Sequence, residues 1–458
     1  MRSPLLVGAG ALALAACSGY ETTVQPIRQS LERGDRAGAL AGVNAKLGVK
    51  SGSQRPAKYE KETSLLLLER AMILQALGRY QDASRDLEEA EKHLELLDLT
   101  KDTAGDIGKY LYSDDVTVYK APAYEKLLLS TENLVNYLAR GDLGGARVEA
   151  RRLAVMQKYL RDEIGADKAR FGLGSYLAGF CFEKSGNPDE ALRFYDEALQ
   201  AQAYLSLDAP IARLAAISSY RTPRIEAAMA RAGGVGAAPL AADEGEVLVV
   251  LQSGLVPRKQ PERIPIGLAF AWAYDVSNPR YAMSPAERNR ANVIVAKGLL
   301  KWVNFPSLKR QPRRAWPAAV IVGGATRGLE PALDVSARVT EAHEAIKGVL
   351  MVSAITRLVA RAVAGEATGY GVKQATGDGV IGLLAGLAVE GVMTAKDTPD
   401  TRSWTTLPAE VSLARVRLPV GEHVVEAHFG SAWGPLTHRA NATLRGRDFQ
   451  VVAFSEPR

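Results

Sequence analysis

The sequence reads GRYQDASRDLEEA at residues 78–90, and the same frame returns as GNPDEALRFYDEA at residues 186–198. Each copy begins with a glycine and carries alanines at its sixth and thirteenth positions. A small residue, Ala71 or Gly179, stands seven positions before each glycine. Because residues three and four apart lie on one face of a helix, this spacing predicts two pairs of closely packed helices, each joined by a turn at the glycine.

The frame resembles the middle of a tetratricopeptide repeat, in which a glycine ends the first helix and alanines pack where the helices cross. The positions that carry the resemblance are Gly78, Tyr80, Ala83, Gly186, Ala191 and Ala198. Weaker copies of the turn begin at Gly34 and Gly141, so the four turn glycines are 44, 63 and 45 residues apart. The family repeats at about 34 residues. The resemblance therefore implies a solenoid of divergent helical hairpins with insertions, one of them at residues 102–122.

A solenoid of this kind carries a functional expectation. Each hairpin is unable to bury its apolar face alone, so neighbouring hairpins stack and leave an extended surface that usually binds a protein or peptide. The alternative is that the hairpins only support the second half of the chain. The sequence leaves both interpretations open.

The N-terminus has the pattern of an export signal. One basic residue, Arg2, precedes an apolar run at residues 5–16. A membrane-spanning helix needs about 20 apolar residues, so this run is too short to be one. The run ends in LAAC at residues 14–17, which resembles the lipobox of bacterial lipoproteins. The resemblance implies that residues 1–16 are removed and that Cys17 is acylated, and Ser18 points to the outer membrane with the body facing the periplasm. The alternative is ordinary cleavage with an unmodified cysteine.

Cysteine usage excludes a disulfide framework. The chain has two cysteines, so a lipid on Cys17 leaves Cys181 as a lone thiol and excludes a cysteine-based zinc site. Its neighbours Phe180 and Phe182 indicate a core position, since free cysteine is among the most buried residue types. A nucleophilic role for Cys181 is the minor alternative.

The composition predicts an ordered protein of two domains. Hydrophobic residues make up 47% and charged residues 24% of the chain, which is typical of soluble globular proteins. We expect a helical domain at residues 17–229, a linker rich in Gly and Ala at 230–244, and a mixed α/β domain at 245–458. The net charge of +6 permits contact with anionic envelope polymers without requiring it, and no nucleic-acid partner is expected.

In the second half the hydrophobic pattern changes. Short runs rich in β-branched residues predict buried strands at 247–251 and 318–322. Apolar residues at helical spacing predict helices at 285–303 and 339–363, and a glycine-rich helix at 376–395. The last is too short in its apolar part to cross a membrane and is interpreted as a closely packed buried helix, with insertion into a membrane surface as the alternative.

The last 50 residues predict strands. Residues 410–418 alternate between apolar and polar, and 422–429 is expected to return as their hairpin partner after a turn at Pro419–Gly421. A second pair is expected at 440–444 and 449–454. The fold class is therefore α+β: a helical-hairpin solenoid followed by a mixed α/β domain that ends in a small antiparallel sheet or sandwich.

Residues 400–408 read DTRSWTTLP and are followed by the turn at 419–423. Here the sequence resembles a family of bacterial tetratricopeptide-like outer-membrane lipoproteins of uncharacterised function. The resemblance covers most of the chain and implies architecture and location, but no activity. The structural interpretation of the motif pairs Arg402 with a carboxylate and buries Trp404 where helix meets sheet.

Motifs for catalysis, metals and cofactors are weak. Residues 377–382 spell a dinucleotide-binding fingerprint, but no strand precedes it as that site requires. The histidines lack the spacing of a zinc site, and His423 and His428 would face opposite sides of one strand. The basic clusters around Lys259 and Arg310 are interpreted as solvated loop charge. We therefore expect no catalytic residue, no metal and no cofactor.

These observations favour a membrane-anchored binding scaffold. The leading hypothesis is a lipoprotein that recruits an envelope protein or a peptidoglycan-associated assembly. An envelope enzyme that acts on glycan is the first alternative, because a pair of catalytic carboxylates is set by spatial geometry and is invisible in sequence. A structural subunit of a larger envelope complex is the second.

Overall fold

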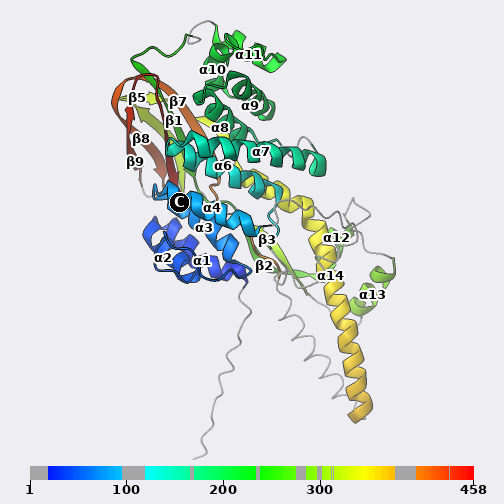
Figure 1. The fold of residues 1–458 in the computed structure, drawn as a ribbon. Coiled ribbons are helices and arrows are strands. Elements are labelled where there is room, and N and C mark those ends of the chain that lie inside the picture. Colours follow the sequence, from blue (N-terminus) through cyan, green and yellow to red (C-terminus); the bar gives the residue numbers. More distant parts are fainter. Residues whose placement is uncertain are drawn as a thin grey trace, which may run out of the picture.

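Helical hairpins make up the first half of the molecule. The computed structural model describes residues 19–94, 119–165, 170–233, 238–274, 285–296, 302–376 apart from 311 and 313, and 399–458 apart from 433. Within residues 19–233 the paired helices are α1 (Tyr20–Glu32) and α2 (Arg36–Lys46), α3 (Thr63–Ala76) and α4 (Tyr80–His93), α6 (Ala123–Ala139) and α7 (Leu143–Ile164), α8 (Gly172–Lys184) and α9 (Pro188–Ala201), and α10 (Asp208–Ala215) and α11 (Pro223–Ala232). Each hairpin packs on the next (Figure 1). The helical hairpins expected in this half are confirmed.

The four turn glycines share one local geometry. Gly34, Gly78, Gly141 and Gly186 have φ values of 81°, 72°, 70° and 73°, a left-handed conformation that only glycine adopts without strain. After each glycine, the next residue's N–H returns to a carbonyl in the last helical turn, as from Arg79 to Leu74 at 2.8 Å. This pattern satisfies carbonyls that the helix end leaves open. The turns expected at these glycines are therefore confirmed.

Small residues lie where the helices cross. Ala83, Ala191 and Ala198 are fully buried. A Cβ atom on Gly179 would come within 2.4 Å of Tyr195 Cδ1, so the ring occupies the space that the missing side chain leaves. Tyr80 is half-buried and its hydroxyl donates to the carbonyl of Ala453 in the C-terminal strand at 3.3 Å.

Two four-stranded sheets form the second half. The first has the order β10 (Phe449–Glu456), β1 (Glu244–Ser253), β7 (Glu410–Pro419), β6 (Glu330–Asp334). The second has the order β5 (Ala325–Arg327), β4 (Ala315–Val322), β8 (Gly421–Ser431), β9 (Leu436–Leu444). β10 runs parallel to β1, and the other neighbours are antiparallel. The strands predicted at 247–251 and 318–322 lie within β1 and β4.

The predicted strand pairing was wrong in two places. Residues 410–418 and 422–429 do form β7 and β8, but β7 joins the first sheet and β8 joins the second. Gly421, with φ of 136°, lies where the chain passes between sheets. The strands at 440–444 and 449–454 belong to β9 and β10, which also lie in different sheets. A short connection therefore makes a corner of a sandwich at both places, and the two sheets are not simple hairpins.

β1 explains why the sheets and the helices form one body. Val247, Val249 and Leu251 face the second sheet and belong to the core between the sheets. Leu248 and Val250 point the other way and belong to the core that the helices share. A strand covered on both faces has a continuous apolar run, as β1 does. Helices α3, α6 and α8 pack against the first sheet, so the helical half covers its outer face (Figure 1).

A ribbon and three helices extend the second half. β2 (Arg258–Pro265) pairs with β3 (Trp302–Lys309), α12 is Ile266–Tyr274, α13 is Pro285–Ala296, and α14 is Val335–Thr376. The helix predicted at 285–303 therefore ends early, because residues from Trp302 onward pair in the ribbon. Lys259 also lies in the ribbon, so its prediction as loop charge was wrong.

The long helix α14 contains the helix predicted at 339–363 and extends past the ribbon (Figure 1). Among the described residues, no helix combines the length and the apolar character needed to cross a bilayer. The predictions for residues 1–16, Cys17, the dinucleotide fingerprint at 377–382 and most of the helix at 376–395 lie outside the described residues. Most of the insertion at 102–122 and part of the linker at 230–244 also do.

Candidate functional site

The segment at residues 399–409 is buried at every residue except Asp400, which is partly exposed. Three charged side chains hold its backbone: Arg28 from α1, Glu69 from α3 and Glu125 from α6. We use the name clamp for these three residues together with residues 404–406, whose backbone they bind. The segment precedes β7, so the clamp ties the first sheet to the helical half.

Glu69 is the centre of the clamp. One carboxylate oxygen accepts the Thr405 N–H at 2.9 Å and the Thr405 hydroxyl at 2.8 Å, and the other accepts the Thr406 N–H at 2.8 Å. The hydroxyl of Tyr20 also donates to Glu69, at 3.0 Å. Burial raises the pKa of Glu69 even though these donors and the Arg28 charge lower it. The carboxylate thus supplies the acceptors that the buried turn at Thr405 and Thr406 needs.

Glu125 and Trp404 complete the clamp. Trp404 is 1% exposed; its backbone N–H donates to Glu125 at 3.0 Å, and its indole N–H donates to the carbonyl of Leu68 at 3.0 Å. The hydroxyls of Tyr119 and Tyr124 donate to the same carboxylate at 2.5 and 3.1 Å. Burial raises the pKa of Glu125, while these donors lower it.

Two arginines act beside this segment. The guanidinium of Arg28 donates to the carbonyls of Thr405 and, at 3.1 Å, Val256. Burial lowers the pKa of Arg28 to about 10, so the group stays charged at neutral pH. Arg402 pairs with Asp400 through two hydrogen bonds of 2.8 Å. All of these groups bind the protein's own chain, so the clamp is a structural device and offers no free site.

A second buried ion cluster also belongs to the framework. Arg415 on β7 contacts Glu183 of α8 at 2.7 Å and Glu246 of β1 at 2.8 Å. The Arg415 and Lys184 charges hold the pKa of Glu183 well below its usual range and that of Glu246 at about 2, against the opposing effect of burial. Permanently charged and mutually paired carboxylates do not suit acid–base catalysis.

An open apolar cavity of about 780 Å³ lies between α6, α14 and the ribbon. Its volume falls in the range of about 300–1,000 Å³ that is usual for small-molecule sites. The lining residues are Pro122, Ala123, Tyr124, Leu127, Arg170, Phe171, Pro257, Lys259, Leu308, Arg338, Val339, Glu341, Ala342, His343, Ala345, Ile346 and Ser403. We call this the cavity.

Two polar groups of the cavity wall lack partners in the described part of the chain. His343 on α14 and Ser403 are each 5% exposed. The Nδ1 of His343 and the hydroxyl of Ser403 are buried and make no hydrogen bond there. Burial lowers the pKa of His343 to about 4, helped by the nearby Lys259 charge, so its imidazole is neutral at pH 7. Protein atoms cover both of these groups almost completely, so the two residues line the cavity with their other atoms.

Charge around the cavity is mainly positive. Arg170, Lys259 and Arg338 line it together with one carboxylate, Glu341. Lys259 donates to the carbonyl of Arg402 at 3.1 Å, and Arg338 contacts Glu341 at 3.4 Å. Apolar walls with a few charged groups are the usual features of a small-molecule site.

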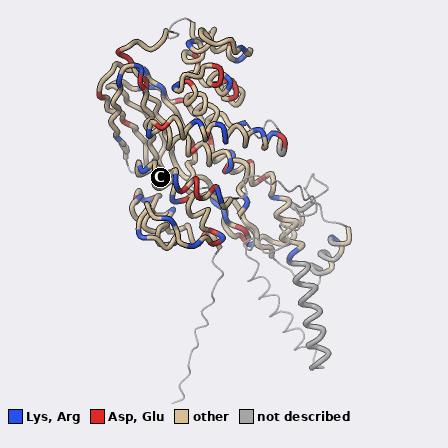
Figure 2. The backbone as a smooth tube through the Cα atoms, viewed as in Figure 1, with Lys and Arg blue, Asp and Glu red and all other residues tan. Residues whose placement is uncertain are grey.

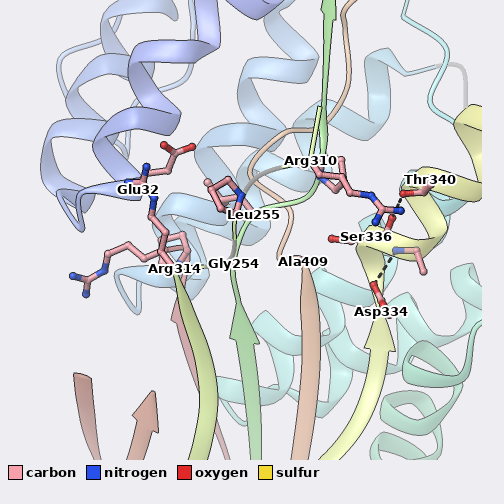
Figure 3. Close-up of a pocket in the computed structure, with 14 residues that line it drawn as sticks. Glu32, Gly254, Leu255, Arg310, Arg314, Asp334, Ser336, Thr340 and Ala409 are labelled. Carbon is pink, nitrogen blue, oxygen red and sulfur yellow. Dashed lines mark hydrogen bonds between the residues drawn. The ribbon is translucent and has the colours of Figure 1, made fainter. Parts of the chain in front are cut away.

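A smaller pocket of about 260 Å³ lies where β1 and β6 end and α14 begins (Figure 3). Figure 3 shows Glu32 and Asp334 on opposite sides of it, with Arg310 reaching toward Thr340. Asp334 already accepts the N–H of Ala337 at 2.8 Å and caps α14. Glu32 and Asp334 therefore lie on opposite sides of the pocket, and Asp334 is already used by the fold.

Other candidate chemistry is limited. Cys181 is buried, and burial raises the pKa of its thiol to about 11, which disfavours a nucleophile. In the part of the chain that the structure describes, no group of three or more His, Cys, Asp or Glu residues is arranged to hold a metal ion. Comparisons with protein-family models, with curated proteins and with solved structures found no match.

Sequence analysis singled out only part of this site. Ser403 lies inside the DTRSWTTLP motif, but its place on a cavity wall comes from the fold. Lys259 was interpreted as solvated, and His343 was considered only as a metal ligand. A signal for Glu69 is present in the sequence: Glu69 and Arg70 interrupt the apolar run of α3, which is buried from Thr63 to Gln75.

Proposed function

We propose that this chain is a lipid-anchored binding protein of the bacterial outer membrane that faces the periplasm and holds an apolar ligand in the cavity. In this proposal the tetratricopeptide-like hairpins are the scaffold. One observation carries it: an open, mainly apolar cavity of about 780 Å³ whose wall also carries the cations Lys259 and Arg338. The inner helical faces contact the clamp segment and the first sheet, which favours the cavity over a peptide groove along the hairpins.

The alternative of a glycan-acting enzyme receives less support. Glycoside hydrolysis uses two carboxyl groups on either side of the bond that is cut. The cavity is lined by one carboxylate among the described residues, Glu341. Binding without chemistry is the function that these groups support best.

A neutral dye that fluoresces in apolar surroundings, such as Nile red, tests the cavity. The chain starting at residue 18 retains every contact described above and should bind the dye. Ala342→Trp fills the cavity from α14 and should lower binding at least about tenfold. Glu344→Trp places the same ring on the exposed face of the same helix and should leave binding unchanged. Equal binding by both variants would contradict the proposal.

The anchor has its own test. Radiolabelled palmitate should enter the full chain in cells, and Cys17→Ser should abolish both the label and membrane retention. A Cys17→Ser chain that stays on the membrane with its leader processed normally would overturn the proposed location.

Recruitment of an envelope protein or a peptidoglycan-associated assembly is the second candidate function. It is favoured by α7, where Val148 and Val155 are 48% and 61% exposed beside basic residues, which Figure 2 shows in blue. Exposed apolar residues within a basic face suit an anionic partner. Val148→Asp with Val155→Asp should release such a partner in pull-downs from solubilised envelopes, whereas Ala342→Trp should not.

A further inference from the structure

The start of the described chain lies beside the ribbon. The N–H of Glu21 donates to the Thr401 hydroxyl at 3.2 Å, and its carboxylate contacts Arg258 of β2 at 3.2 Å. Gly19 is two residues from Cys17, and two extended residues span at most about 7 Å. A lipid on Cys17 would therefore put this end of the molecule next to the membrane.

The same end exposes large apolar side chains. Leu268 on α12, Val293 on α13, Trp302 on β3 and Ile346 on α14 are 44%, 54%, 47% and 36% exposed. α12, α13 and β3 all pack on α14. Exposed apolar patches mark interaction surfaces, and tryptophan is enriched where proteins meet the membrane–water interface. This surface and the anchor independently indicate the same membrane-facing end.

The cavity lies between elements of this end, because its lining includes residues of α14 and of the ribbon. Its apolar walls fit a hydrocarbon chain. The side chains of Lys259 and Arg338 fit an anionic group. The acyl groups of the protein's own anchor carry no anionic headgroup, so the charge of the cavity wall favours an anionic phospholipid as the occupant.

We propose, on the basis of the proposed function, that the cavity takes up an acyl chain of an anionic phospholipid from the adjacent bilayer. The hydrocarbon lies against α6 and α14, and the phosphate lies near Lys259 and Arg338. The binding step is a transfer of one chain from bilayer to protein and involves no covalent change.

The test uses the full, lipid-modified chain in phosphatidylcholine vesicles that contain a trace of phosphatidylglycerol with a photoactivatable acyl chain. After illumination, mass spectrometry should locate the label on residues 122–127 and 338–346. The phosphatidylcholine version of the probe should label at least about fivefold less, because each cation near an anionic headgroup contributes about 1 kcal/mol. Ala342→Trp should reduce labelling at least about tenfold, and Glu344→Trp should not.

A charge variant tests the headgroup. Arg338→Gln should lower the preference for the anionic probe about fivefold. Arg193→Gln is the matched control: Arg193 also pairs with a glutamate three residues away on a helix and has a side-chain exposure of 36%, against 34% for Arg338. Its preference should stay unchanged.

Three outcomes would overturn the inference: no label on the cavity segments, equal labelling by both headgroups, or labelling only by a photoactivatable free fatty acid. If any of these outcomes occurs but Ala342→Trp still weakens Nile red binding, the proposed function survives and the lipid inference fails. If Ala342→Trp also leaves Nile red binding unchanged, both fail.

Discussion

The clamp and the cavity are adjacent at the peptide bond between Ser403 and Trp404, but they differ in whether their polar groups have hydrogen-bond partners. On one side, the Trp404 N–H and the groups of Thr405 and Thr406 are bound by carboxylates of the helices. On the other, Ser403 lines the cavity, and its buried hydroxyl has no partner among the described residues. An unsatisfied buried group costs about 1–3 kcal/mol. The comparison shows that hydrogen bonds fix residues 404–406 directly beside Ser403. This part of the cavity wall is therefore held in place although the cavity itself is open.

The largest expected effect breaks the clamp. Glu69→Ala removes the acceptor of two backbone N–H groups and two hydroxyls and takes away the main carboxylate that stabilises the buried Arg28 charge. We expect the free energy of unfolding, measured in urea, to fall by about 3–5 kcal/mol. Glu341→Ala at the cavity, where the side chain is 67% exposed, should change it by less than about 0.5 kcal/mol. Similar losses in both would remove the distinction between the regions.

Glu132 is a buried carboxylate that accepts fewer hydrogen bonds than Glu69 and Glu125 of the clamp, so it tests what satisfied donors contribute. Glu132 accepts from Gln252 at 2.7 Å, but its other oxygen has no partner in the described residues, and burial raises its pKa to about 7. The folded state therefore holds a proton that the unfolded state releases near pH 4.5. This contribution to stability is complete below pH 4.5 and is lost as the pH rises through 7.

Glu132→Gln should remove that pH dependence. Relative to the unchanged chain, the variant should gain on the order of 3 kcal/mol at pH 8 and almost nothing at pH 4.5, as measured by urea unfolding at both values. Glu125→Gln is the control within the clamp and should lose about 1–2 kcal/mol, because three donors already satisfy that carboxylate. The same sign in both variants would contradict the comparison.

The smallest expected changes in stability come from two nearby hydroxyls, those of Thr405 in the clamp and Ser403 at the cavity. Thr405→Val keeps the shape but loses the 2.8 Å hydrogen bond to Glu69, and should lower the free energy of unfolding by about 1.5 kcal/mol. Ser403→Ala removes a buried hydroxyl without a partner among the described residues and should raise the free energy of unfolding by about 1 kcal/mol. Thermal unfolding of the two variants side by side measures the difference.

Local features of the fold could be predicted from the sequence, because local rules determine them. The turn glycines at 34, 78, 141 and 186 need positive φ, and the run at 247–251 predicts a buried strand. Strand partners could not be predicted. β7 and β8 lie close in sequence, but their apolar faces serve different sheets, and only the assembled sandwich decides this.

The clamp and the cavity depend on contacts that no local pattern contains. Glu69 and Thr405 are 336 residues apart, and the short stretch around Glu69 gives no sign of its partner. The motif at 400–408 could be recognised as unusual, since it combines charged, hydroxyl and aromatic residues. The location of Ser403 beside His343 required the packing of α6 on α14.

β10 has a consequence for how the protein is made. It lies about 200 residues after β1 in the sequence, yet it pairs with β1, with Glu246 opposite Phe449, and packs on α3 and α6. Early domains usually fold while synthesis continues. Here the first helices lack part of their support until residues 449–456 have emerged from the ribosome. For a polypeptide that has to cross a membrane before folding, as proposed for this one, that delay would keep the newly made chain competent for export.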